Sequence, residues 1–308
     1  MNVVFFGTSK FAVPSLKKFI SSNHRILAVI TQPDRRKGRH LKLSISPVKE
    51  VAAKFKLKIL QPEKFDEAFI NKLKSLNPDI FIVIAFGHIL KKEVFEIPSF
   101  YSVNLHASLL PKYRGAAPIN WAIMNGETKT GVTIIKMNEM MDKGDIILQR
   151  EVDINPDDTS FILGKKLSQI GADSLLRTLE DIENNKENFI KQNSRRATYA
   201  RKLKKEDGLI DWKKTATEIH DKVRGLISWP GAYTIFNRKI LKIWKTQVLK
   251  EKTGKPGEII RAEGDSLIVG TAKGQLKILE LQLEASKRMD VASFLRGHKI
   301  SVGSKLNL

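Results

Sequence analysis

Short apolar segments alternate with amphipathic segments over roughly the first third of the chain. The apolar segments are rich in β-branched and aromatic side chains, as strands are, and they cover residues 3–7, 26–31, 58–60, 79–85 and 102–105. Segments with helical spacing lie between them, at 11–21, 47–55 and 66–76. Repetition of a strand, a helix and a further strand predicts an α/β fold with an open, mostly parallel sheet and helices on both faces.

Ligands of such an open sheet bind beyond the carboxyl ends of the strands, near the point where the strand order reverses. The loops that follow residues 7, 31, 85 and 105 are therefore candidates for a site. A helical segment at 116–124, strand-like segments at 131–137 and 145–152, and a long helix over 159–183 with Thr159 as its N-cap continue the pattern. We expect one Rossmann-like domain over residues 1–189.

The composition changes after this domain. Residues 186–205 contain eight basic residues and one acidic residue. We interpret 190–207 as a basic linker, although a merely solvated connection would have the same composition. One helical segment (216–226) and five short strand-like segments follow, at 232–236, 239–248, 257–261, 266–270 and 275–281, separated by turn residues. This pattern predicts a small, OB-like β-barrel over residues 208–308.

Net charge is the extreme feature of the composition. The 308 residues include 54 basic and 33 acidic side chains, which gives a net charge of +21. Such a charge favours a polyanionic partner, above all nucleic acid, although a lysine-rich codon bias could raise it without any partner. No apolar run is long enough for a membrane span, and the N-terminal residues lack a secretory signal. Together with the absence of cysteine, these features predict a cytoplasmic protein without disulfides.

Several common chemistries lack their sequence signals. Gly7-Thr8-Ser9 could receive an anion, but neither the glycine spacing of a dinucleotide site nor that of a nucleoside-triphosphate loop is present. The six histidines form no metal-binding pair, so we expect no metal.

Asn104 and His106 are the strongest candidates for catalysis. They stand at the carboxyl end of a predicted strand, and their side chains leave the same face because strand side chains alternate. An amide can stabilise an oxyanion and an imidazole can carry a proton, so the pair suits acyl transfer. Asp142 lies in a polar turn that could reach the same end of the sheet and orient the imidazole. Taken singly, Asn104 and His106 would be interpreted as a hydrogen-bonded core pair at a strand end, and the Asp142 turn as a hairpin signal only.

Three ordered runs resemble a known family, the 10-formyltetrahydrofolate-dependent formyltransferases. They are Asn104-x-His106-x-Ser108-Leu109-Leu110-Pro111, Tyr113-Arg114-Gly115 and Asp142-x-Gly144-Asp145. Supporting runs are Gly7-Thr8-x-x-Phe11-Ala12, Thr31-Gln32-Pro33-Asp34-Arg35, Ala85-Phe86-Gly87 and Ile210-Asp211-Trp212. Within that family the chain resembles, from end to end, the members that act on methionyl-tRNA.

The resemblance implies that Asn104, His106 and Asp142 are the catalytic residues. It also implies a segment that contacts the folate and a loop whose backbone lines a pterin pocket; these comprise Ser108, Leu109, Leu110 and Pro111, and Ala85, Phe86, Gly87, His88, Ile89 and Leu90. Phe86 stands where the family often has tyrosine, which would remove one hydroxyl contact.

The loop from Gln32 to Leu43 resembles an insertion that the family uses against the acceptor end of tRNA. The basic residues expected at the tRNA are Arg35, Arg36, Lys37, Arg39, Lys42, Arg195 and Arg196. Without the resemblance, this loop would be interpreted as solvated.

The implied function is transfer of a formyl group from 10-formyltetrahydrofolate, as co-substrate, to initiator methionyl-tRNA. We expect a monomer with no obligate protein partner and no membrane association. A glycinamide ribonucleotide formyltransferase or a formyl-folate hydrolase would share the three catalytic residues, but neither explains the charge or the last hundred residues. A non-catalytic RNA-binding protein is disfavoured because all three catalytic residues are present.

Overall fold

The computed structural model of the protein describes residues 1–37, 42–251 and 254–307, and for Arg36, Lys37 and Lys42 it describes the backbone alone. The contacts divide the chain into two compact units. Residues 1–118, 129–153 and 164–200 form the first unit, and residues 119–128, 154–163 and 201–308 form the second.

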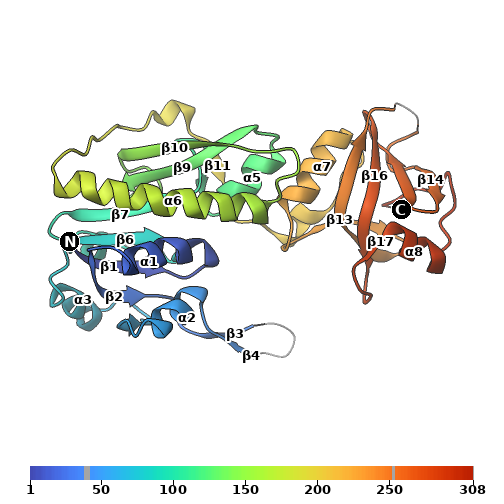
Figure 1. The fold of residues 1–308 in the computed structure, drawn as a ribbon. Helices are drawn as coiled ribbons and strands as arrows, with labels where there is room; N and C mark the ends of the chain where they lie inside the picture. The colour runs from blue at the N-terminus through green and yellow to red at the C-terminus, as the bar shows by residue number, and fades with distance from the viewer. Residues whose placement is uncertain (38–41, 252–253, 308) are drawn as a thin grey trace. The chain divides into compact units, whose positions relative to one another are not determined.

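A seven-stranded sheet organises the first unit (Figure 1). Its strands are β1 (Asn2–Gly7), β2 (Arg25–Ile30), β5 (Ile59–Leu60), β6 (Ile80–Ile84), β7 (Tyr101–His106), β9 (Lys129–Lys136) and β10 (Ile146–Asp153), in the order β10-β9-β7-β6-β1-β2-β5. Five adjacent strands run parallel to one another, namely β5, β2, β1, β6 and β7, whereas β9 is antiparallel to β7 and β10 is antiparallel to β9. The mostly parallel sheet expected from the sequence is thus confirmed.

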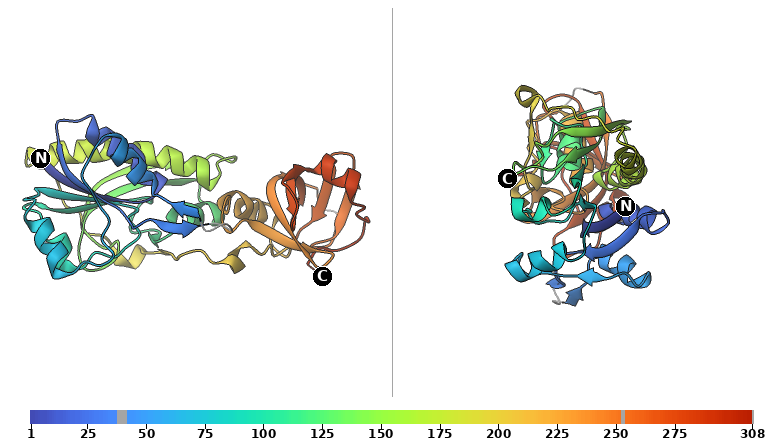
Figure 2. Two further views of the ribbon diagram at one scale, coloured as in Figure 1. Left: turned by 90° about the horizontal axis from the view of Figure 1, so that it is seen from below. Right: turned by 90° about the vertical axis from the view of Figure 1, so that its left-hand side faces the viewer.

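Helices cover both faces of this sheet. They are α1 (Val13–Ile20), which follows the 3-10 turn Lys10–Ala12, α2 (Pro47–Lys54), α3 (Glu67–Lys74), α4 (Lys92–Phe95) and α6 (Ser160–Glu183). Phe19 of α1 packs on Phe5, and Gly171 of α6 lies against Leu105, so α1 and α6 share one face. Figure 2 shows both helices on the same side of the sheet. Val4, Phe6 and the helices α3 and α4 contribute to the core on the opposite face.

Alternating strand side chains explain this double burial. Phe5 and Leu105 point to the face of α1, whereas their neighbours along the strands point to the other face. The continuous apolar composition of β1 and β6 is therefore the expected pattern of a parallel strand that is buried on both sides.

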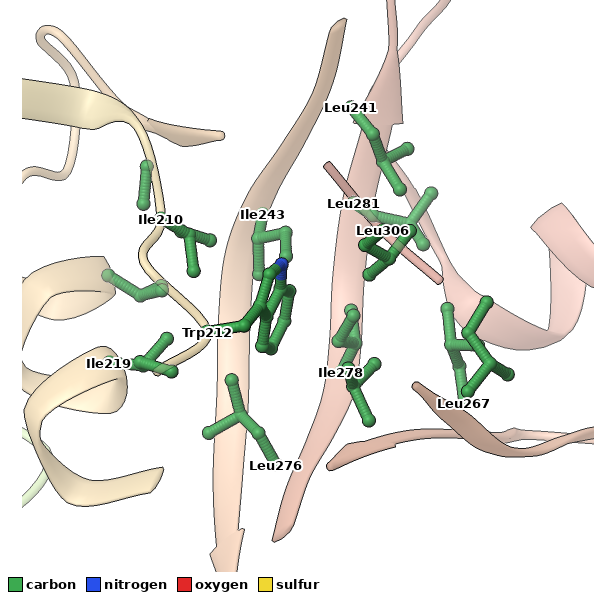
Figure 3. Close-up of a cluster of buried hydrophobic side chains, with 14 of the residues drawn as sticks. Ile210, Trp212, Ile219, Leu241, Ile243, Leu267, Leu276, Ile278, Leu281 and Leu306 are labelled. Atoms are coloured by element: carbon green, nitrogen blue, oxygen red, sulfur yellow. The ribbon is translucent and has the colours of Figure 1, made fainter. Parts of the chain in front are cut away.

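Antiparallel strands organise the second unit. They are β12 (Ala232–Phe236), β13 (Lys239–Leu249), β14 (Ile259–Glu263), β15 (Ser266–Gly270), β16 (Gln275–Leu283) and β17 (Met289–Asp290), in the order β12-β13-β16-β15-β14 with β17 beside β16. Helices α7 (Ala216–Gly225) and α8 (Val291–Gly297) accompany them. Their buried side chains form one hydrophobic core that includes Trp212, part of which Figure 3 shows. The five predicted strands and the first helix are confirmed.

The last described residues join the two outer strands of this sheet. Backbone groups of Gly303, Ser304 and Leu306 bond to Gly257 and Ile259 at the start of β14. On the other side, the Asn307 N–H donates to the carbonyl oxygen of Ile235 in β12, at 2.9 Å. Both outer strands thus have backbone partners, which gives the sheet the closure expected of a barrel.

The second unit includes two segments from the middle of the chain. One contains all but the first residue of α5 (Pro118–Met124), and the other, 154–163, leads into α6. The Asn120 amide donates to the carbonyl oxygen of Gly225 at 2.7 Å, and the guanidinium of Arg224 donates to that of Asp158 at 2.9 Å. These bonds tie both segments to α7.

The stability of the second unit should depend on pH through His220. Burial, which disfavours the charged form, lowers the pKa of His220 from its ordinary value of 6.5. Just below that value the unfolded chain binds more protons than the folded protein, so the free energy of unfolding falls as the pH is lowered through 6.5. Urea unfolding at about pH 7.5 and about pH 5.5 should show this fall, and a smaller fall in His220→Gln.

Burial also lowers the pKa of His24, so part of the fall should persist in that variant. An identical fall in the wild type and in His220→Gln would contradict the assignment.

No helix in the described part of the chain has the length and hydropathy of a membrane span.

Candidate active site

Three of the loops expected to form a site meet at the carboxyl ends of β1, β2 and β6. The Thr8 hydroxyl, just after β1, donates to the carbonyl oxygen of Phe86 at 2.8 Å and accepts from the Gln32 N–H at 3.3 Å. One hydroxyl group therefore links the loops after all three strands. This edge of the sheet is also where the strand order reverses, between β1 and β6.

His106 is the last residue of β7, and only 6% of its surface is exposed. Its Nε2 lies 2.9 Å from the carbonyl oxygen of Tyr113. Because a carbonyl oxygen can only accept, the hydrogen bond places a proton on Nε2. The other ring nitrogen, Nδ1, lies 3.5 Å from Oδ1 of Asp142. In the neutral ring Nδ1 is then the atom able to take up a proton.

Asp142 lies in the turn between β9 and β10 and faces this imidazole. Its backbone adopts the left-handed region, with φ at 54°, which is uncommon for a residue other than glycine. The second carboxylate oxygen, Oδ2, accepts from the Gly115 N–H at 2.8 Å. The structure thus brings together His106 and Asp142, which are 36 positions apart in the sequence.

Asn104 lies two residues before His106 on the same face of β7. Its Nδ2 donates to the carbonyl oxygen of Val83 in β6, at 3.1 Å, and its side chain is half-buried. One amide hydrogen is held by the neighbouring strand, which fixes the plane of the amide. A fixed donor beside an imidazole suits the stabilisation of charge during acyl transfer.

Residues 113–115, which include β8 (Arg114–Gly115), hold both members of the His106–Asp142 pair. The Tyr113 carbonyl fixes the imidazole and the Gly115 N–H fixes the carboxylate. Tyr113 and Gly115 both have positive φ angles, 59° and 119°. A Cβ atom on Gly115 would lie 2.7 Å from the Ala200 carbonyl oxygen, so only glycine fits without a shift.

The segment expected to contact folate is firmly held by the protein. The Ser108 hydroxyl donates to the Lys112 carbonyl oxygen at 2.6 Å. Thr133 donates to the Ser108 carbonyl and accepts from the Leu110 N–H, at 2.6 and 3.1 Å. Ser108 and Leu110 are buried, whereas Leu109 and Pro111 are partly exposed.

In the loop from Ala85 to Leu90, some residues are exposed to solvent and others are buried. Phe86 and Leu90 belong to the core, and the ring of Phe86 packs edge-on against Phe6. Ala85, Gly87, His88 and Ile89 are exposed, Ile89 to 70%. Ala85 and Gly87 have positive φ angles, 42° and 83°. Any contribution of Phe86 or Leu90 to a ligand would therefore come from the backbone.

The residues expected to contact tRNA lie on two segments. Arg35, Arg36 and Lys37 form β3 (Arg35–Lys37), which pairs with β4 (Lys42–Ser44), whereas Arg39 lies outside the described residues. Arg195 and Arg196 are exposed in the 3-10 turn Ser194–Arg196.

Asp34 anchors the base of the β3–β4 hairpin. Its carboxylate accepts from Lys49 at 2.5 Å and from Gln61 at 2.9 Å, and these hydrogen bonds, that of Lys49 first, hold the pKa of Asp34 below its ordinary value. The carboxylate thus remains ionised beneath a basic hairpin.

Sequence reasoning missed two residues beside the site. Arg114 is 98% buried, and its Nε and Nη2 donate to Oε1 of Gln192 at 3.1 and 2.7 Å. Arg114 was visible as part of a motif, but Gln192 lies in a basic segment that shows no separate signal. Among the described residues, no group of three or more histidine or acidic side chains could hold a metal ion.

Comparison with known proteins agrees with this arrangement. The family described as formyl transferase matches residues 1–179, and the family described as formyl transferase, C-terminal domain, matches residues 202–299. The chain is 46% identical to the methionyl-tRNA formyltransferase of Caldanaerobacter subterraneus subsp. tengcongensis, over 99% of this chain and 100% of that protein. It is 48% identical to that of Clostridioides difficile, over 98% and 99%.

Solved structures share the fold at lower identity. A sugar 3N-formyl transferase, WlaRD, has a TM-score of 0.69 at 24% identity and covers 93% of this chain and 99% of its own. A methionyl-tRNA formyltransferase from Clostridium thermocellum has a TM-score of 0.57 at 22% identity, with 83% and 95% coverage.

Proposed function

Because the chain belongs to the formyl transferase family, we propose that it transfers the formyl group of 10-formyltetrahydrofolate to the α-amino group of initiator methionyl-tRNA. The observation that carries this proposal is the extent of the likeness: relatives named methionyl-tRNA formyltransferase match 98–99% of the chain, including the second unit. A preference for glycinamide ribonucleotide would leave the second unit without a role.

Asn104, His106 and Asp142 would carry the chemistry. Asn104 donates to the formyl oxygen, which gains negative charge as the amine nitrogen adds to the formyl carbon. His106 and Asp142 together would remove the proton that the amine loses; the 3.5 Å between Nδ1 and Oδ1 supports a shared role for these two atoms. The bond from the formyl carbon to N10 of the folate then breaks, and N10 takes up a proton.

Residues 85–90 and 108–111 would hold the folate, and formyl transfer would take place within residues 1–189. The tRNA would be held by the basic hairpin, by Arg195 and Arg196 of the basic linker 190–207, and by the C-terminal residues 208–308. Phosphate contacts from arginine and lysine position a nucleic acid without reading its sequence. The same proposal includes a cytoplasmic, monomeric enzyme.

The function is tested by offering the protein formyl-folate with either methionyl-tRNA or glycinamide ribonucleotide, at two salt concentrations. We expect formylation of methionyl-tRNA alone, weakened by salt because counterions compete for the basic residues. Formylation of glycinamide ribonucleotide, or hydrolysis of formyl-folate without an acceptor, would refute the proposal.

Arg39→Ala should raise the KM for methionyl-tRNA about tenfold, because a charged hydrogen bond to phosphate is lost. The KM for formyl-folate should remain nearly unchanged. Steady-state kinetics with each substrate varied in turn measures both, and Arg25→Ala, at an exposed arginine that begins β2, is the matched control. An equal loss of folate affinity would contradict a role at the tRNA.

A further inference from the structure

Gln192 joins a buried cation to the turn that carries Asp142. Its Oε1 accepts from both Nε and Nη2 of Arg114, and its Nε2 donates to the carbonyl oxygens of Asp142 and Gly144, at 2.8 and 2.7 Å. We propose that Gln192 is a positioning residue for formyl transfer, which holds the Asp142 carboxylate against His106. This inference rests on the proposed function.

The Asp142 turn needs such support because its backbone is strained. Asp142 has a positive φ, and conformations of this kind persist only where the surroundings impose them. A Cβ atom on Gly144 would lie only 1.7 Å from the Lys136 carbonyl oxygen, so the turn is pressed closely against β9. Two hydrogen bonds from the Gln192 amide, to carbonyl oxygens two residues apart, hold the backbone of the turn in this conformation.

Glutamine is the side chain that these partners require. The guanidinium of Arg114 can only donate and the two carbonyl oxygens can only accept, so the orientation of the amide is fixed by its partners. Glutamate could accept from Arg114 but would set a carboxylate oxygen against two carbonyl oxygens. An apolar side chain would leave the buried guanidinium without this acceptor, at a large cost in stability.

The segment that carries Gln192 contributes further to the site. Thr198 accepts the Tyr113 N–H through its hydroxyl at 2.9 Å, and β11 (Tyr199–Ala200) pairs with β8. The carbonyl of Tyr113 and the N–H of Gly115 are the groups that hold His106 and Asp142. Residues 192–200 therefore hold in place the backbone segments that bind His106 and Asp142. These residues lie between the two ranges that the family models match, 1–179 and 202–299.

Gln192→Glu in the full chain tests this role. The variant keeps an acceptor for Arg114 and loses both donors to the turn, so we expect kcat to fall about ten- to a hundredfold. The KM values for formyl-folate and methionyl-tRNA should change little, and the pH dependence of kcat should change shape because the Asp142–His106 pair is no longer held. A structural defect alone would lower the rate by the same factor at every pH.

Gln169→Glu is the matched control. Gln169 is exposed on α6, within the first unit, and lies outside the residues assigned to folate, to tRNA or to the chemistry. The same chemical change there should leave kcat and its pH dependence unaltered. A wild-type kcat and pH dependence in Gln192→Glu would overturn the proposal.

The double variant Arg114→Met/Gln192→Leu keeps the test decisive if Gln192→Glu does not fold. It removes the buried charge together with its partner, which avoids an unpaired guanidinium. A loss of kcat similar to that expected for Gln192→Glu supports the proposal, whereas full activity overturns it. Failure of the proposed function is distinguishable, because the wild-type protein itself would then not formylate methionyl-tRNA.

Discussion

Asn104→Ala should lower kcat for the formylation of methionyl-tRNA about a hundredfold or more, because the donor that stabilises the developing oxyanion is lost. The KM for formyl-folate should change much less, since the contact strengthens only as charge builds on the formyl oxygen. Single-turnover rates at saturating folate measure the chemical step directly. Asn104→Asp, which keeps the shape and replaces the donor by a charged acceptor, should lose at least as much.

Asn125→Ala, at an exposed asparagine just beyond α5, is the matched control and should retain the wild-type rate. The assignment of Asn104 would be wrong if its alanine variant kept kcat and raised only the KM for folate. In that case the amide would contribute to substrate binding, with no role in the transition state.

Asp142→Asn should reduce the rate of formyl transfer on the order of a thousandfold. The amide oxygen can still accept from the Gly115 N–H, so the turn should keep its shape. What disappears is the negative charge 3.5 Å from Nδ1 of His106. Without it, a proton taken up by Nδ1 of the imidazole is no longer stabilised.

The single-turnover rate over a range of pH checks this expectation. Glu139→Gln changes an exposed carboxylate that precedes the Asp142 turn and pairs with Lys92 at 3.2 Å, and it should have no such effect. Equal rates in Asp142→Asn and in the wild type would exclude the carboxylate from proton handling.

Strand and helix positions in the first unit could be predicted from the sequence because local pattern and tertiary burial agree there. β1 and β6 are continuously apolar because they are covered on both faces, and Thr159 begins the long helix α6 by accepting the Ile162 N–H at 3.3 Å. The carboxyl ends of parallel strands share one edge, so the site could be placed on that edge before its geometry was known.

Elements held by tertiary contacts alone could not be predicted. β8 and β11 have only two residues each, and they form because the 113–115 and 198–200 segments meet. Helix α8 begins at an Asp290 cap, where the Ser293 N–H donates to the carboxylate, but its apolar residues were too few to distinguish it from a strand or a loop.

The residues of the His106–Asp142 pair could be selected from the sequence, but their geometry could not. His106 and Asp142 were chosen by residue type and motif, yet their distance depends on how β7 pairs with β9, where His106 lies opposite Thr133. Gln192 was invisible for a different reason. Its neighbours Lys191 and Asn193 are polar and exposed, and a single glutamine in such a segment gives no periodic signal of burial.

The bonds that tie α5 and residues 154–163 to α7 limit how the protein can be recombined with its relatives. A chimera that exchanges only residues 201–308 would pair a foreign α7 with the original Asn120 and Asp158, the partners of Gly225 and Arg224. The exchangeable module is therefore discontinuous in the gene. A chimera that keeps this module intact exchanges residues 119–128, 154–163 and 201–308 together.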